Sequence, residues 1–281
     1  MAIDTSLVGA ESATHTFTYD WKTLAAYALG IGAKKDELAY LYEGTPGGIR
    51  VFPTFAVVPA FAPSTEMLMK TGANLAMVVH GSQSIRLHRA VPSEGTVATT
   101  ATIRGIYDMK RFASVVVDTR STIDGEPVFD TTWTIIVRDG GNFGGPRPPA
   151  DAAPSIPKDR APDFTAEEAT SPEQALLYRL SGDVNPLHAD PELARSVGFP
   201  QGPILHGLCT YGFAGRAVLR HACGGDPAKL RSFAAQFRKP VWPGDTIVTQ
   251  GWDLGGGQWA LTASVKERPD AVLTSTWAEI G

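Results

Sequence analysis

A stretch of 23 residues rich in glycine and proline constrains the fold of this chain more than any other feature. Residues 140–162 read GGNFGGPRPPADAAPSIPKDRAP and contain four glycines and six prolines. Proline has no backbone N–H and fixes φ, so this segment cannot continue a helix or a β-ladder. We therefore predict a linker over 140–162 between an N-terminal unit, residues 1–139, and a C-terminal unit, residues 163–281.

Both units show the same order of predicted elements, and each is long enough to enclose its own core. The N-terminal unit is predicted to contain a helix over 20–33 and strands over 96–107, 112–123 and 128–138, the last two joined at Asp124-Gly125. The C-terminal unit is predicted to contain a helix over 207–221 and strands within 239–254, 258–267 and 271–280. A helix followed by long antiparallel strands indicates an α+β fold with a sheet wrapped on a helix.

Composition and charge exclude several classes of function. The chain is 43% hydrophobic and 19% charged, which is typical of a folded protein, and its net charge of −4 leaves no broad basic face for nucleic acid. Two cysteines cannot form a disulfide framework, and no apolar run is long enough to span a membrane. No signal peptide or C-terminal peroxisomal signal is visible, so we expect a cytoplasmic protein.

The segment with the most candidates for acid/base chemistry is YRLSGDVNPLHADP, residues 178–191. Asp183 and His188 are separated by an Asn-Pro turn that can bring a carboxylate and an imidazole to one point. A water held by both groups would be activated by general acid/base chemistry. The alternative is structural, with Asp183 capping a turn and His188 hydrogen-bonded inside the fold.

Neighbouring residues admit other interpretations. Asp190 precedes Pro191 and Glu192, a pattern typical of the N-cap of a helix. A metal site would combine His188 and Asp190 with His206 or His221, but so short a motif is weak support and we expect no metal.

Gly207 begins the second predicted helix, where backbone N–H groups have no partner within the helix. Its amide is therefore a candidate oxyanion donor, although a glycine at a tight helix entry is the simpler structural interpretation. Cys209 lies two residues further on and would be a nucleophile only if it were not part of the core.

Taken together, YRLSGDVNPLHADPELARSVGF and PILHGLCTYGFAGRAVL resemble the hydratase 2 signature of the MaoC-like family. The resemblance is closest to the (R)-specific 2-enoyl-CoA hydratases and the hydratase unit of peroxisomal multifunctional enzyme type 2. It implies a double hotdog, in which two antiparallel sheets each wrap a central helix. It also implies reversible hydration of trans-2-enoyl-CoA to (3R)-3-hydroxyacyl-CoA, which is a hydro-lyase activity in fatty acid metabolism such as β-oxidation.

The resemblance also implies roles for individual residues. Asp183 and His188 match the catalytic pair, Asn185 matches a residue that positions the water, and Gly207 matches the oxyanion donor. The N-terminal unit would be non-catalytic and would shape the acyl and CoA pocket. The matches to substrate or CoA contacts are His80, Gly81, Lys110, Val184, Pro186, Leu187 and Phe237.

The resemblance implies an acyl-CoA substrate and no metal or redox cofactor, and it leaves a homodimer of such chains open. Two other functions remain in competition with the hydratase. One is a hotdog acyl-CoA thioesterase, which has the same fold and ligand but hydrolyses the thioester. The other is an acyl-CoA-binding subunit without catalytic activity.

Overall fold

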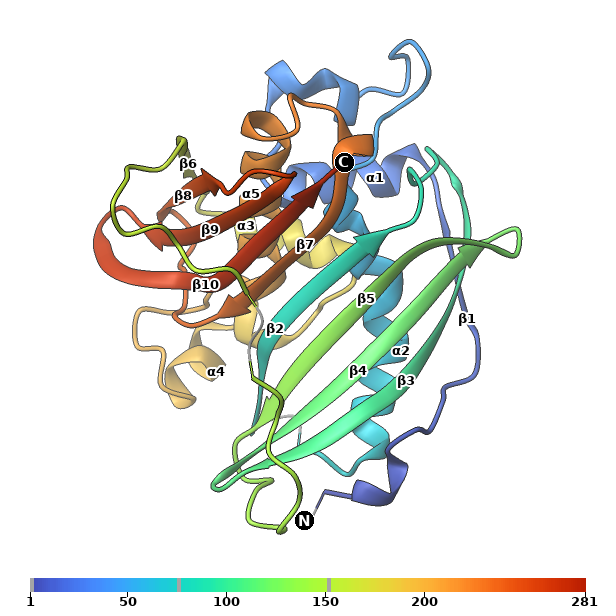
Figure 1. The fold of residues 1–281 in the computed structure, drawn as a ribbon, viewed down its shortest axis with the longest axis vertical. Helices are drawn as coiled ribbons and strands as arrows, with labels where there is room; N and C mark the ends of the chain where they lie inside the picture. The colour runs from blue at the N-terminus through green and yellow to red at the C-terminus, as the bar shows by residue number, and fades with distance from the viewer. Residues whose placement is uncertain (1–2, 75–76, 151–152) are drawn as a thin grey trace.

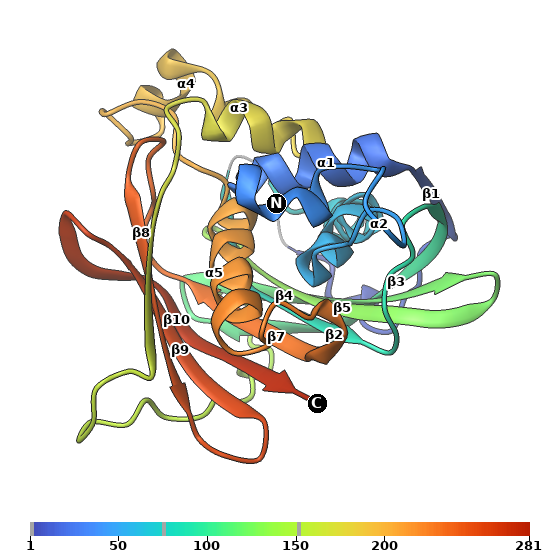
Figure 2. The same cartoon turned by 90° about the horizontal axis from the view of Figure 1, so that it is seen from above.

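The computed structural model describes residues 3–74, 77–150 and 153–281, and these form one antiparallel sheet of ten strands (Figure 1). The strand order is β1-β3-β4-β5-β2-β7-β10-β9-β8-β6, so each unit contributes five consecutive positions. The sheet curves around two helices, one from each unit (Figure 2). The predicted α+β double hotdog is confirmed, with its two sheets continuous with each other.

The N-terminal half of the sheet holds the first five strands. Its elements are β1 (His15–Tyr19), α1 (Trp21–Gly30), α2 (Val57–Lys70), β2 (Val78–Leu87), β3 (Gly95–Met109), β4 (Phe112–Ile123) and β5 (Glu126–Val137). The three strands predicted here correspond to β3, β4 and β5. Asp124 and Gly125, with φ of 54° and 82°, form the predicted turn between β4 and β5.

The C-terminal half repeats this arrangement. Its elements are β6 (Phe164–Ala169), α3 (Gln174–Tyr178), α4 (Pro191–Ser196), α5 (Gly207–His221), β7 (Leu230–Phe237), β8 (Thr246–Asp253), β9 (Gln258–Val265) and β10 (Arg268–Ile280). The predicted helix over 207–221 is confirmed as α5, and the three predicted strands correspond to β8, β9 and β10.

The prediction for the N-terminal helix was wrong in one respect. A helix does form near 20–33, as α1, but the helix that packs inside this half of the sheet is α2. The sequence does not predict α2, because Pro59 and Pro63 lie within it and proline disfavours helix interiors. The segment is helical nonetheless because its residues are buried against β3 and β4, and this packing outweighs intrinsic propensity.

The two halves are joined by backbone pairing between β2 and β7. The register runs from Ser82 opposite Gln236 to Arg86 opposite Ser232, with Ser84 opposite Ala234 at its centre. Neither strand was predicted, since β2 is interrupted by Gly81 and β7 contains few β-branched residues. The pairing removes the free edge that each half would otherwise expose.

Helix α5 lies between the halves, and two of its glycines allow close packing. A Cβ added at Gly212 would lie 2.3 Å from Cγ2 of Ile31, and one added at Gly215 would lie 2.6 Å from Cγ2 of Thr54. Real side-chain carbons cannot approach so closely, so only glycine lets the N-terminal unit pack here.

A buried arginine connects the halves further. The Arg216 side chain on α5 is 2% exposed and contacts Glu37 at 2.7 Å and Glu168 at 3.1 Å. Its Nη1 also donates to the carbonyl oxygen of Ile31 at 2.8 Å. Burial raises the pKa of Glu168, and the Arg216 charge opposes that rise. The charges of Arg216, Glu37 and Glu168 are largely removed from water, so each is stabilised mainly by the opposite charge beside it.

The linker region carries no helix or strand over 140–150 or 153–162, the parts of it that the structure describes. Its beginning folds against the β3–β4 hairpin, where the Asp108 carboxylate accepts hydrogen bonds from the backbone of Asn142 and Gly144. Within the described ranges, none of the helices has both the length and the apolar character needed to cross a membrane.

Arg216→Met should lower the free energy of unfolding at neutral pH by about 3–5 kcal/mol, because the largely buried Glu168 loses its cation and Glu37 keeps only the exposed Arg220. The substitution raises the pKa of Glu168 further, so the folded state binds more protons than the unfolded state above pH 4.5. The loss should therefore be smaller at pH 5 than at pH 8, measured by urea unfolding. Arg220→Met is the control: Arg220 is 46% exposed and contacts Glu37 at 3.3 Å, so its loss should cost under about 1 kcal/mol. Equal decreases in unfolding free energy for the two variants would contradict the inference that burial makes the Arg216 ion pairs more important than that of Arg220.

Candidate active site

The loop between α3 and α4 is built from turn-forming residues. Gly182 adopts φ of 115°, which a residue with a side chain rarely accepts, and this directs the chain into Asp183. Asn185 then caps a short 3₁₀ turn, Pro186–His188, by accepting a hydrogen bond from the Leu187 N–H at 3.0 Å. The turn places the His188 side chain inward, where it is buried.

One hydrogen bond defines the protonation of the His188 ring. Its Nδ1 lies 2.8 Å from the carbonyl oxygen of Ile204, which can only accept, so Nδ1 carries the proton. Burial lowers the pKa of His188, although the Ile204 carbonyl and Asp183 oppose the shift. The ring is therefore neutral at pH 7 and its Nε2 offers a lone pair.

His206 supports this arrangement from the neighbouring segment. Its ring stacks on His188 with centroids 3.7 Å apart, and its Nε2 donates to the Asp183 carbonyl oxygen at 3.0 Å. Burial and the neighbouring His188 lower the pKa of His206 to about 2, so this ring is also neutral. The sequence predicts His206 only as a possible metal ligand, and its position before Gly207 is the one signal there for a wider role.

Asp183 and His188 converge as the Asn-Pro turn predicted. Ligand atoms of Asp183, His188 and His206 all lie within 4.8 Å of one another. A water that hydrogen-bonds to two groups can span about 5.6 Å between them, so the Asp183 carboxylate and the His188 ring are close enough for one water to contact both. The Asp183 side chain also accepts from the Asn185 N–H at 3.1 Å, which restrains the carboxylate.

Asp183, His188 and His206 are also residue types that could bind a metal ion. The geometry of the two rings distinguishes metal binding from proton transfer. The rings of His188 and His206 are stacked with an interplanar angle of 28°. An ion bound by both rings would lie well outside both ring planes, whereas imidazole lone pairs point within the plane. This geometry favours proton transfer over metal binding.

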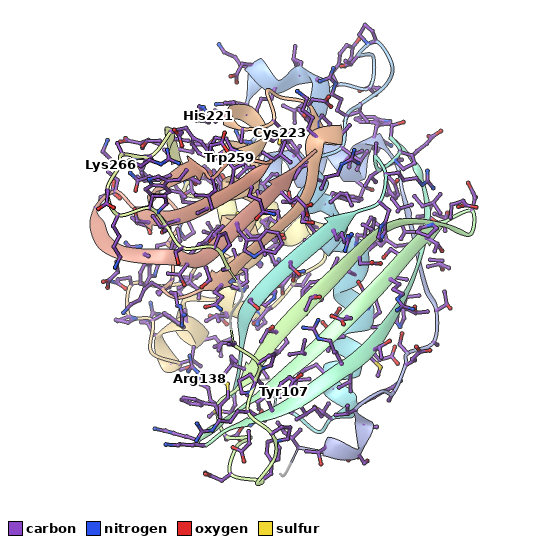
Figure 3. All side chains as sticks on the ribbon, viewed as in Figure 1. Tyr107, Arg138, His221, Cys223, Trp259 and Lys266 are labelled. Carbon is purple, nitrogen blue, oxygen red and sulfur yellow. The ribbon has the colours of Figure 1, made fainter. Side chains whose placement is uncertain are left out.

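The alternative metal set is not assembled. Asp190 is the N-cap of α4, as predicted, and accepts from the backbone N–H groups of Glu192 and Leu193. His221 lies in the last turn of α5, where it stacks on Phe164, which also contacts Trp259 (Figure 3).

Gly207, the candidate oxyanion donor, follows His206 directly in the chain. It is the first residue of α5, so its N–H has no acceptor within the helix. A Cβ here would lie 3.2 Å from the Phe237 ring, which means that the backbone faces this ring directly. Phe237 in turn contacts the His80 ring at 4.7 Å, and His80 stacks on Trp133 at 5.1 Å.

His80 and Gly81 are brought to Phe237 by the joined sheet. Gly81 forms a bulge between β2 and β5, and an added Cβ would lie 2.9 Å from Ile136. Burial lowers the pKa of His80 to about 4, and its Nε2 has no hydrogen-bond partner among the residues the structure describes. Residues of both halves thus meet at the predicted substrate surface.

Other predicted site residues lie on the outer side of the loop or away from it. Val184 and Pro186 are exposed, and Leu187 is half-buried. Lys110 is exposed in the turn between β3 and β4, with φ of 65°, and its N–H donates to Asp108. Cys209 is buried with its pKa raised well above normal, and its Sγ contacts the Gly30 carbonyl, so it belongs to the core.

Two pockets meet at this loop. His188 and Ala189 line a pocket of 440 Å³, with Trp242 and Arg268 on its far side. A second pocket, of 630 Å³, is lined by Gly182 and by the face of α2 that carries Phe61 and Met69. Phe61 contacts Trp133 at 6.1 Å, so an aromatic wall continues from α2 to His80.

Comparison with known proteins agrees with this geometry. Residues 155–275 match the MaoC like domain, and residues 17–139 match the MFE-2 hydratase 2 N-terminal domain. The 3-hydroxyacyl-thioester dehydratase Y of Mycobacterium tuberculosis is 42% identical over 267 residues, covering 92% of this chain and 90% of that protein.

The chain belongs to the MaoC-like hydratase 2 family. A probable enoyl-CoA hydratase 2 of Dictyostelium discoideum is 38% identical over 240 residues, covering 83% of this chain and 81% of that protein. The crystal structure of a MaoC-like dehydratase from Phytophthora capsici superimposes with a TM-score of 0.88 and 36% identity, covering 99% and 98% of the two chains.

In this MaoC-like protein, NMR of ¹⁵N-labelled imidazoles should find His188 protonated on Nδ1 and titrating below pH 6.5. Asp183→Asn should lower the pKa of His188 further, because the Asp183 charge stabilises the imidazolium. Asp190→Asn makes the same chemical change two residues away and should leave this pKa nearly unchanged. An equal effect of both substitutions would show that Asp183 does not face the ring.

Proposed function

We infer that the chain is an enoyl-CoA hydratase that also catalyses the reverse dehydration of 3-hydroxyacyl thioesters. The observation that carries this inference is the convergence of ligand atoms of Asp183, His188 and His206 within 4.8 Å of one another, with Gly207 beginning α5 directly after His206. The relatives named for this reaction match both units of the chain. We further propose that the product has the 3R configuration, as the resemblance to the (R)-specific hydratases implies.

The proposed reaction uses one water between Asp183 and His188. The pair removes a proton from this water as its oxygen adds to C3 of the enoyl group. Electron density then moves onto the thioester oxygen, which accepts a hydrogen bond from the Gly207 N–H. The pair returns a proton to C2 on the same face, so that H and OH are added across the double bond. Both histidines are neutral at the start, which suits His188 to accept a proton.

The N-terminal unit is proposed to hold the acyl chain. The wall formed by Phe61, Trp133, His80 and Phe237 leads from the 630 Å³ pocket on α2 towards Gly207. This unit has no counterpart of the D-x-N-P-x-H segment, so it shapes the pocket without acid/base groups. Lys110 is proposed as a contact for a CoA phosphate, supported by its exposure and charge.

Asp183→Asn and His188→Gln should each reduce the rate of enoyl-CoA hydration by about 10²–10⁴, the usual contribution of a general acid or base. The assay is the loss of enoyl absorbance, with melting temperature as the check on folding. Asp190→Asn, which retains a capping side chain, should keep nearly full activity. Hydration by Asp183→Asn at the wild-type rate would favour a binding subunit instead.

Gly207→Pro tests the amide donor separately. Proline is favoured at the first position of a helix, and His206 has φ of −59° and ψ of 137°, which suits a residue before proline. The substitution removes the N–H and should reduce the hydration rate by about 10²–10³. Gly207→Ala adds a Cβ beside Phe237 but keeps the N–H, so it should retain most of the activity. Equal decreases in hydration rate in both variants would mean that the added side-chain atoms, and not the loss of the N–H, reduce the activity.

The reaction products distinguish a hydratase from the alternative, an acyl-CoA thioesterase. A hydratase consumes the enoyl group without releasing CoA, whereas a thioesterase releases a free thiol. Both can be followed in one reaction with a thiol reagent and the enoyl absorbance. Release of one thiol per enoyl group consumed would reverse the assignment.

A further inference from the structure

The pairing of β2 with β7 creates an approximate two-fold axis. The sheet order is the same when read outwards from this pair, with β5 matching β10, β4 matching β9, β3 matching β8 and β1 matching β6. Ser84 lies opposite Ala234 at the centre of the antiparallel register. Residues at equal distances from these two positions are therefore counterparts.

Three positions at or near the candidate active site have counterparts across this axis. Phe237, three residues after Ala234, corresponds to Leu87, and Gly81, three residues before Ser84, corresponds to Arg231. Pro203, four residues before α5, corresponds to Pro53, four residues before α2.

These three counterparts, Leu87, Arg231 and Pro53, all line one cavity of 320 Å³. Pro203 itself lines the 440 Å³ pocket that contains His188. The duplicated fold therefore has a second pocket at the position related by the approximate two-fold axis to the candidate active site.

The second pocket has different chemistry. It is lined by Arg50, Arg89 and Arg231, with Asp226 as its single acidic lining residue, and the Asp226 side chain already caps the backbone of Ala228. The apolar lining consists of Ile49, Val51, Pro53, Leu87, Ala90, Val91, Pro227, Ala228 and Leu230. In place of an acid/base pair, the lining carries three exposed arginines together with these apolar residues.

The arginines are positioned by neutral groups. Arg89 donates to the carbonyl oxygen of Ile123 at 3.3 Å, and the Arg50 charge opposes the rise that burial causes in the pKa of Tyr40. In the described part of the chain, none of the three lies in an ion pair, whereas Arg216, Arg220 and Arg268 do. The positive charge around the cavity is thus largely uncompensated.

We propose that this cavity binds a phosphate monoester whose organic part is apolar or aromatic. A dianionic phosphate matches the two net positive charges of the lining, and guanidinium forks bind phosphate oxygens through paired hydrogen bonds. The volume suits a small ligand, since such pockets begin at about 300 Å³. The site is separate from the Asp183–His188 centre and performs no hydration.

The test is calorimetric titration of the full chain with phenyl phosphate. The wild type should bind one equivalent, and Arg231→Gln and Arg89→Gln should each weaken binding about tenfold or more, as expected for the loss of a charged hydrogen bond. Arg120→Gln, on the exposed face of β4, makes the same charge change and should bind like the wild type. Inorganic phosphate and benzyl alcohol should each bind at least tenfold more weakly, since each supplies half of the ligand.

Three results would overturn the proposal. The first is no heat of binding with millimolar phenyl phosphate. The second is unchanged affinity in both Arg231→Gln and Arg89→Gln, with melting temperatures showing that the variants are folded. The third is loss of binding in Asp183→Asn, which would place the ligand in the candidate active site.

Discussion

The backbone pairing of β2 with β7 is the interaction on which the rest of this structure depends. It joins two five-stranded halves into one sheet and places His80 and Gly81 of one half beside Phe237 of the other. The start of α5 then faces the same Phe237 ring. Without this pairing, the loop that carries Asp183 and His188 would lack the aromatic wall proposed to hold the acyl chain, because most of that wall belongs to the N-terminal unit.

Burial controls the chemistry that the loop can perform. His188 and His206 are stacked and desolvated, and each donates one ring N–H to a backbone carbonyl, so both rings are neutral and of known tautomer. The energetic cost of this desolvation is offset by the tightly packed interface around α5. A rigid, water-poor surrounding is also what makes a backbone amide effective as a donor to a developing oxyanion.

Duplication supplies two equivalent positions, and the side chains differentiate them. On one side of the axis, the segment before α5 carries Asp183 and His188. On the other side, the segment before α2 carries Arg50, and β7 contributes Arg231. The same backbone plan therefore offers two equivalent pockets, for which we propose proton transfer at one and phosphate recognition at the other, because pocket shape follows from the fold while chemistry follows from a few side chains.

The sequence by itself determined the features that depend on local interactions. The bounds of α5, the strands from β3 to β5 and from β8 to β10, the Asp190 cap and the Asn185-Pro186 turn all follow from short-range patterns. Only the tertiary structure decided that α2 is a central helix despite its prolines, that β2 and β7 pair, and that His206 stacks on His188. Those outcomes depend on burial and on contacts between residues distant in the chain, and neither periodicity nor capping preference carries that information.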